Sequence, residues 1–122
     1  MAKIAIIEDD QAISQMYRIK FESEGYDVDT AENGKLGLEL CEKMKPDIVL
    51  LDLMMPEMTG GEMLELMRKT DWGAKTRVVI LTNMGEQEIP ADVKKLGVSS
   101  VILKADMTPR QVAELVKKQL AH

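Results

Sequence analysis

The chain has 122 residues and a formal net charge of −5, with 45% apolar and 30% charged residues. This length and balance predict one globular domain spanning residues 1–122. The negative charge argues against a nucleic-acid backbone or an anionic membrane surface as the main partner.

Segments typical of buried strands alternate with segments of helical periodicity along the chain. The third strand stretch, 47–56, is the clearest, because four apolar residues run directly into Asp52 and Pro56 ends it. The predicted strands are 3–7, 26–31, 47–56, 77–82 and 99–103, and the predicted helices are 11–24, 34–44, 60–70, 90–97 and 109–120.

Helix ends carry recognisable signals. Asp10 is placed to cap the first helix, and Gly25 to stop it. Thr59 and Thr108 each open a capping box, the second with Pro109 at the first helical position. The apolar stripes predicted to face inward are Ile13, Met16, Tyr17 and Phe21, then Met63, Leu66 and Met67, and finally Val112, Leu115, Val116 and Leu120.

Alternating strands and helices with right-handed crossovers predict an α/β fold, a parallel sheet covered by helices on both faces. The carboxyl ends of parallel strands lie at one edge of the sheet, where such folds place their chemistry. Four of the five predicted strands end there in polar side chains, namely Glu8 with Asp9, Asp52, Thr82 and Lys104.

Three carboxylates brought together repel one another, and a hard divalent cation such as Mg²⁺ relieves that repulsion. The sequence lacks the residues that several other kinds of functional site need. The only histidine is His122 at the very end of the chain, which argues against a Ser-His-acid or Cys-His site. No glycine-rich phosphate-binding motif is present.

From end to end, the chain resembles the receiver domain of two-component response regulators. The segments that carry the resemblance are IIEDD, VLLDLMMPEMTG, VVILT and VILK, in this order and spacing. The resemblance implies a flavodoxin-like, doubly wound sheet of five parallel strands in the order 2-1-3-4-5.

The same resemblance implies a role for each site residue. Asp52 would be the phosphoacceptor, taking a phosphoryl group from a phosphohistidine of a sensor kinase or phosphotransfer protein. Glu8, Asp9, Asp52 and the backbone carbonyl of Met54 would hold Mg²⁺. Lys104 would pair with the phosphoryl group and Thr82 would hydrogen-bond to it. A loose phosphoryl-transfer transition state asks mainly for alignment and charge neutralisation, which this set provides.

Several positions depart from the receiver pattern. Val101 replaces an aromatic residue, so the rotamer change that this aromatic residue makes on activation is expected to be absent or replaced by another movement. Ala105 replaces a proline, so a trans Lys104–Ala105 bond is expected. Asn83 is expected to slow labelling by small phosphodonors. Apolar Met54 and Met84 cannot orient a water molecule by hydrogen bonding, so a long-lived phosphoryl group is expected.

Three functions are weighed. The first is a phosphorylated receiver that signals to a protein partner. By analogy with the family, its output face would be the fourth predicted helix, the fifth strand and the fifth helix (90–97, 99–103 and 109–120). It would have no nucleic-acid or membrane partner and no enzymatic turnover beyond its own phosphorylation and dephosphorylation. The second is a pseudo-receiver, a binding module that is not phosphorylated. The third is an Asp-nucleophile phosphohydrolase, which commonly needs an acid where Met54 stands. The single cysteine, Cys41, and the absence of a leader or a membrane-length apolar run favour a cytoplasmic protein.

Overall fold

The computed structural model describes residues 2–55, 57–83 and 88–121. Its five strands form one parallel sheet in the order β2-β1-β3-β4-β5, which confirms the predicted fold class and strand order. The strands are β1 (Lys3–Ile7), β2 (Asp27–Ala31), β3 (Ile48–Leu51), β4 (Arg77–Thr82) and β5 (Ser100–Leu103). The helices are α1 (Gln11–Ser23), α2 (Gly34–Met44), α3 (Gly60–Arg68), α4 (Ala91–Lys94) and α5 (Pro109–Leu120).

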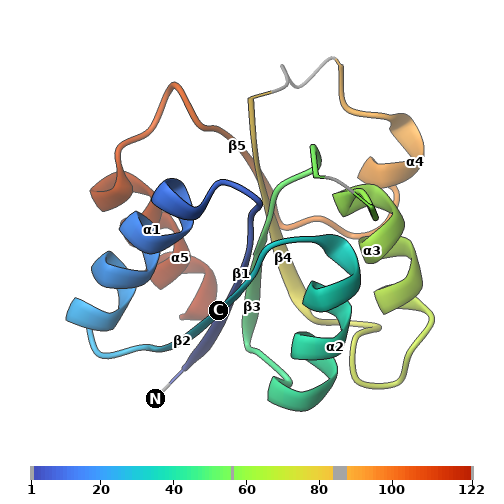
Figure 1. The fold of residues 1–122 in the computed structure, drawn as a ribbon, viewed down its shortest axis with the longest axis horizontal. Coiled ribbons are helices and arrows are strands. Elements are labelled where there is room, and N and C mark those ends of the chain that lie inside the picture. The colour runs from blue at the N-terminus through green and yellow to red at the C-terminus, as the bar shows by residue number, and fades with distance from the viewer. Residues whose placement is uncertain (1, 56, 84–87, 122) are drawn as a thin grey trace.

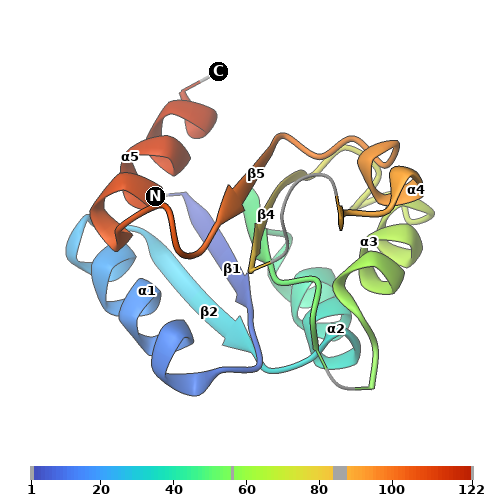
Figure 2. The same cartoon turned by 90° about the horizontal axis from the view of Figure 1, so that it is seen from above.

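The sheet is the middle of three layers. Figures 1 and 2 show α1 and α5 on one face and α2, α3 and α4 on the other. Each face has its own apolar cluster. One gathers Tyr17 and Phe21 of α1 with Val112 and Val116 of α5, and the other is built largely from β-strand, α2 and α3 side chains. No helix in the described ranges is both long and apolar enough to cross a bilayer.

The predicted caps are present. The Asp10 carboxylate accepts hydrogen bonds from the backbone N–H groups of Ala12 and Ile13, at 3.0 and 3.2 Å. Thr59 and Thr108 each form a capping box, and Pro109 lies in the first turn of α5. Gly25 follows the end of α1 with a φ of 91°, a conformation that glycine adopts without strain. Local sequence therefore fixes where these helices begin and end.

Two residues that were predicted to face inward do not. Met16 and Leu66 are 42% and 40% exposed, whereas Ser14 and Leu64, two residues earlier in each helix, are buried. Helical spacing identifies an apolar stripe but does not show which residue lies at its centre. In both helices, the predicted residue lies on the side that the sheet does not cover. Leu115 and Leu120 are only partly buried, at the edge of the α1–α5 cluster.

Four elements, β2, β5, α1 and α3, are shorter than predicted by one or two residues, and two are much shorter. β3 covers only Ile48–Leu51, so the chain leaves the sheet at Asp52, and Pro56 lies outside the described residues. α4 is a single turn, Ala91–Lys94, rather than a helix reaching Gly97. Its N-cap, Pro90, makes no side-chain capping hydrogen bond, so little stabilises a longer helix from that end.

Candidate functional site

The polar strand ends predicted to meet do lie along one edge of the sheet. The sheet's hydrogen bonding continues one residue past the strand ends and fixes them in place. The Asp52 N–H donates to the carbonyl of Ile7 at 3.0 Å, and the Lys104 N–H donates to the carbonyl of Thr82 at 2.8 Å. The backbone of neighbouring strands thus sets the positions of these side chains.

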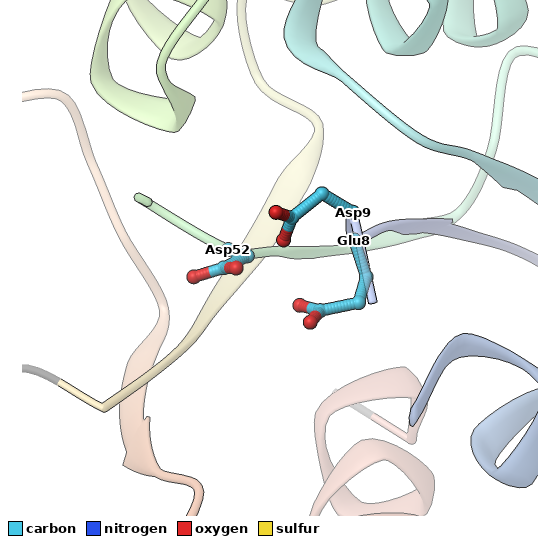
Figure 3. Close-up of side chains that lie close together, drawn as sticks. All are labelled: Glu8, Asp9 and Asp52. Carbon is cyan, nitrogen blue, oxygen red and sulfur yellow. The ribbon is translucent and has the colours of Figure 1, made fainter. Parts of the chain in front are cut away.

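Three carboxylates gather at this edge. Glu8 and Asp9 follow β1 and Asp52 follows β3, and one oxygen from each lies within 4.8 Å of the others. Figure 3 shows Glu8 and Asp9 extending toward Asp52. Glu8 and Asp52 are 2% and 4% exposed, whereas Asp9 is exposed. Two of the three acids are therefore largely removed from water, and the third opens the cluster to solvent.

Lys104 supplies the positive charge of this cluster. Its Nζ lies 2.7 and 2.8 Å from the two carboxylate oxygens of Glu8, and 3.4 Å from Oδ2 of Asp52. The lysine side chain is only 12% exposed, so these ion pairs are shielded from solvent. The sequence placed Lys104 near Asp52, but the structure shows Glu8 as its nearer partner.

The electrostatics reflect this crowding. Burial raises the pKa of Glu8 to about 7, against the opposing hydrogen bond from Lys104, and the negative charge of Asp52 raises it further. Burial alone would lower the pKa of Lys104, but the hydrogen bond to Glu8 and the charges of Asp52 and Glu8 raise it overall. The cluster thus holds more negative charge than one ammonium group balances.

The donor set fits a hard divalent cation. Carboxylate oxygens are the ligands that Mg²⁺ prefers, and they come here from two neighbouring strands at ligand-like separations. Asp9, the exposed member, leaves room for water ligands, which Mg²⁺ commonly retains. A soft metal finds no matching ligands here, because Cys41 is buried in α2, away from this edge, and burial raises the pKa of its thiol to about 12.

Met54 and Thr82 complete the predicted set. The Met54 N–H donates to Oδ1 of Asp52 at 3.2 Å, so this residue does lie beside the carboxylate, and the residue as a whole is 63% exposed. No described contact involves its carbonyl, and the role of that carbonyl as a ligand stays a prediction. Thr82 is fully buried at the end of β4.

Gly60 is a residue of this site that sequence reasoning did not identify. It begins α3, and a Cβ added there would collide with the carbonyl oxygen of Asp52. Its N–H also donates to the carbonyl of Leu53 at 3.3 Å. Only glycine lets the start of α3 approach the backbone of Asp52 so closely, although the sequence showed Gly60 only as a break after the strand.

Tyr17 also lies nearer the site than its helical position suggested. It is 2% exposed, and its ring stacks on Phe21 at a centroid distance of 6.3 Å. Burial raises the pKa of its phenol, with the charge of Lys104 lowering it and that of Glu8 raising it. The sequence placed Tyr17 on the inner face of α1, but nothing in the sequence related it to Lys104.

The structure shows the surroundings of most of the residues that depart from the receiver pattern. Val101 is half-buried and packs against the cluster on the α2–α3 face, with no ring to rotate. All described peptide bonds are trans, which confirms the expectation for Lys104–Ala105. Asn83 is exposed immediately after β4, and its effect on phosphodonors stays a prediction. Met84 lies outside the described residues.

Comparison with known proteins gives consistent matches. The model of a family described as the response regulator receiver domain matches residues 4–117. Sporulation initiation phosphotransferase F of Bacillus subtilis is 35% identical over 118 residues, which cover 97% of this chain and 93% of that protein. A CheY-like receiver domain protein from Methanospirillum hungatei has the same fold, with a TM-score of 0.90 and 28% identity over 99% of this chain and 94% of that one.

Some relatives are much longer than this chain. The DNA-binding dual master transcriptional regulator RpaA of Synechocystis is 38% identical over 86 residues, which are 70% of this chain but 36% of that protein. The match therefore covers only about a third of RpaA, so the activity of the whole RpaA protein cannot be assigned to this chain.

Proposed function

Since this chain belongs to the response regulator receiver domain family, we propose that it is a phosphorylatable signalling switch with Asp52 as the phosphoacceptor. A carboxylate oxygen of Asp52 attacks the phosphorus of a phosphohistidine on a sensor kinase or phosphotransfer protein. The P–N bond breaks, and its electron pair returns to the imidazole nitrogen. The observation that carries this proposal is the gathering of Glu8, Asp9, Asp52 and Lys104 at one edge of the sheet.

Asp52 is held ready for this reaction by its two neighbours. Its Oδ1 accepts the Met54 N–H at 3.2 Å, and its Oδ2 lies 3.4 Å from the ammonium group of Lys104. These contacts fix the direction of the carboxylate before the donor arrives, which is the kind of alignment that a loose transition state rewards. Lys104 is also close enough to move from Glu8 toward the incoming phosphoryl group.

We propose Mg²⁺ as the cofactor, held by Glu8, Asp9, Asp52 and the Met54 carbonyl. When bound, it neutralises the charge on the transferring phosphoryl oxygens. With the acids of this chain as its ligands, Glu8 would no longer need Lys104 as its counter-ion, and Lys104 could contact the phosphoryl group. The hydroxyl group of Thr82, at the end of β4, donates a hydrogen bond to the phosphoryl group.

Phosphorylation adds a charge of about −1.5 to −2 at Asp52, which draws Lys104 and Thr82 toward it. Thr82 is the last residue of β4 and Lys104 directly follows β5, and these strands lead toward α4 and α5. The signal is therefore proposed to pass to a protein partner through the α4-β5-α5 face. The net charge of −5 supports a protein partner over nucleic acid or membrane. The protein is proposed to work in the cytoplasm and to turn over no substrate other than its own phosphoryl group.

The test is Mg²⁺-dependent phosphorylation by phosphoramidate, a small donor with the P–N bond of phosphohistidine, followed by intact-protein mass spectrometry. The wild type should gain one phosphoryl group with Mg²⁺ and none with excess EDTA. Asp52→Asn should gain none. Asp47→Asn, immediately before the same strand, is the matched control and should behave as the wild type.

Two other outcomes identify the alternatives. Absence of phosphorylation from both phosphoramidate and a panel of autophosphorylated kinases would favour a pseudo-receiver that acts only by binding. Continuous release of phosphate from small phosphate esters would favour the phosphohydrolase. The exposed, apolar Met54 stands where that enzyme class commonly places its second acid, which supports the receiver function over it.

A further inference from the structure

A groove separates the amino-terminal half of α3 from α4, on the side of the molecule away from β5. It encloses a cavity of about 290 Å³. Its floor is apolar, formed by Leu53 and Val93, which are each 6% exposed, and Pro90 and Met54 lie at its mouth. At its base the two elements approach closely, since a Cβ added to Gly61 would lie 3.1 Å from a methyl carbon of Val93.

One guanidinium group links α3, which forms one wall of this groove, to the turn after α4, which forms the other. Arg68, at the end of α3, donates from Nε to the carbonyl of Leu96 at 2.7 Å and from a terminal nitrogen to that of Gly97 at 3.1 Å. The other terminal nitrogen donates to the carbonyls of Gly73 and Thr76, at 2.8 and 2.7 Å. Arg68 therefore connects α3 to the turn after α4, and the groove is formed before any ligand binds.

The rim of the groove is negative. Glu62, Glu65 and Asp92 lie around the apolar floor, and no lysine or arginine is among its described lining residues. The carboxylate of Glu62 also accepts the N–H of Thr59 at 3.3 Å, which holds that charge in place at the helix start. An apolar floor inside an acidic rim is complementary to a cationic, amphipathic ligand.

The cations nearest this rim do not neutralise it. Arg68 is occupied by the four carbonyl groups. Lys69 lies 3.7 Å from Glu65, but the two side chains are 69% and 58% exposed, and such pairs are weak. Lys94 lines a separate cavity with Val98 and Val101, on the β5 side of α4.

The volume of the cavity limits what it can hold. Pockets for whole small molecules commonly measure about 300–1,000 Å³, so a cavity of about 290 Å³ suits one large side chain better than a metabolite. We propose that the α3–α4 groove binds a basic amphipathic helix of a protein partner, with one aliphatic side chain in the cavity and lysines or arginines on the acidic rim.

This surface is distinct from the α4-β5-α5 face proposed for output. It uses the opposite side of α4 and the first turns of α3. The groove is present without a phosphoryl group on Asp52, so binding there does not require phosphorylation. Met54 belongs to both places, since its N–H contacts Asp52 while its exposed side chain lies at the mouth of the groove.

The test is a titration of the ¹⁵N-labelled full chain with a lysine–leucine peptide whose leucines recur at helical spacing. The amide signals of residues 59–65 and 91–93 should shift most. Two further peptides separate the contributions: one has glutamate in place of lysine, and the other has serine in place of leucine. Neither should produce these shifts, because one loses the charge match and the other loses the apolar anchor.

Charge reversal supplies the matched variants. Glu65→Lys/Asp92→Lys should weaken the lysine–leucine peptide by at least about tenfold, because like charges then face each other across the groove. Glu39→Lys/Glu114→Lys changes the net charge equally on α2 and α5, and should weaken binding by no more than about twofold at physiological salt.

Three results would overturn the proposal. The first is equal weakening by the two charge-reversed proteins, which would mean general attraction to an acidic surface. The second is equal binding of the serine peptide, which would mean that the cavity takes no anchor. The third is a concentration-dependent shift of the same amides without any peptide, which would assign the groove to a second copy of this chain.

Discussion

The ammonium group of Lys104 is held by Glu8 more closely than by Asp52: Nζ lies 2.7 and 2.8 Å from the oxygens of Glu8 and 3.4 Å from the nearer oxygen of Asp52. Glu8 is 2% exposed, so its charge has little access to water. In the metal-free state the lysine therefore serves as the counter-ion of Glu8, and it must leave Glu8 to contact a phosphoryl group on Asp52.

Removing this counter-ion should destabilise the metal-free protein in a pH-dependent way. Lys104→Met keeps the aliphatic stem but leaves Glu8 buried without its partner, which should cost about 1–3 kcal/mol of the free energy of unfolding at pH 8. At pH 6 the loss should be smaller, because Glu8 can then take up a proton. Urea unfolding at the two pH values measures this, with the exposed Lys95→Met as control. Equal losses at both pH values would contradict the ion-pair explanation.

Glu8 should make the metal-free protein less stable as pH rises from about 4.5 to about 7. Its pKa is raised from 4.5 to about 7 in the folded chain, so in this window the unfolded state has lost a proton that the folded state keeps. The stability contribution of Glu8 is therefore fully present below pH 4.5 and is lost as pH approaches 7.

The measurement is the difference in unfolding free energy between wild type and Glu8→Gln in EDTA, across this pH range. The wild type should lose stability relative to the variant as pH rises. Saturating Mg²⁺ should reverse that trend, because a cation favours the charged form of Glu8. A difference that stays constant with pH would show that the pKa of Glu8 is not raised.

Gly60→Ala should destabilise the chain by about 1–3 kcal/mol, since its added methyl group collides with the carbonyl oxygen of Asp52. Gly61→Ala is the matched control on the next residue. There the methyl group would meet Val93 at 3.1 Å, and the better helix propensity of alanine offsets this, so the change should stay within about 1 kcal/mol. Chemical unfolding of the two variants checks this, and a reversed order would contradict the described approach of α3 to Asp52.

The phosphoryl group on Asp52 should persist for minutes or longer at neutral pH. Met54 lies beside the carboxylate but is apolar, so it cannot orient an attacking water molecule. Met54→Gln supplies an amide at this position and should shorten the lifetime severalfold, while Met54→Leu should leave it unchanged. Mass spectrometry after removal of the donor follows the decay. A wild-type half-life of seconds would refute this prediction.

Much of the fold followed from local signals in the sequence. β1 and β4 have the predicted bounds because both are short apolar runs ended by charged or polar residues. The alternation of strands and helices then required a parallel sheet, which brings Asp52, Thr82 and Lys104 to one edge. The residue types at the strand ends therefore predict where the candidate site lies.

Other features depend on contacts that sequence patterns do not contain. The length of α4 depends on a cap that Pro90 does not supply and on Arg68, which binds the carbonyls of Leu96 and Gly97. The preference of Lys104 for Glu8 over Asp52 depends on sub-ångström differences across the site. The need for glycine at position 60 arises from the packing of α3 on the backbone of Asp52, which the sequence alone does not show.

The most direct test of the account is chemical trapping of the phosphorylated residue. Borohydride reduces an acyl phosphate of aspartate to homoserine, and peptide mass spectrometry locates the product. After treatment with phosphoramidate and Mg²⁺, the wild type should contain homoserine at position 52 and nowhere else, with none formed in EDTA or in Asp52→Asn. Homoserine at Asp9, or its absence from a protein that carries Mg²⁺, would contradict the assignment of Asp52 as the phosphoacceptor.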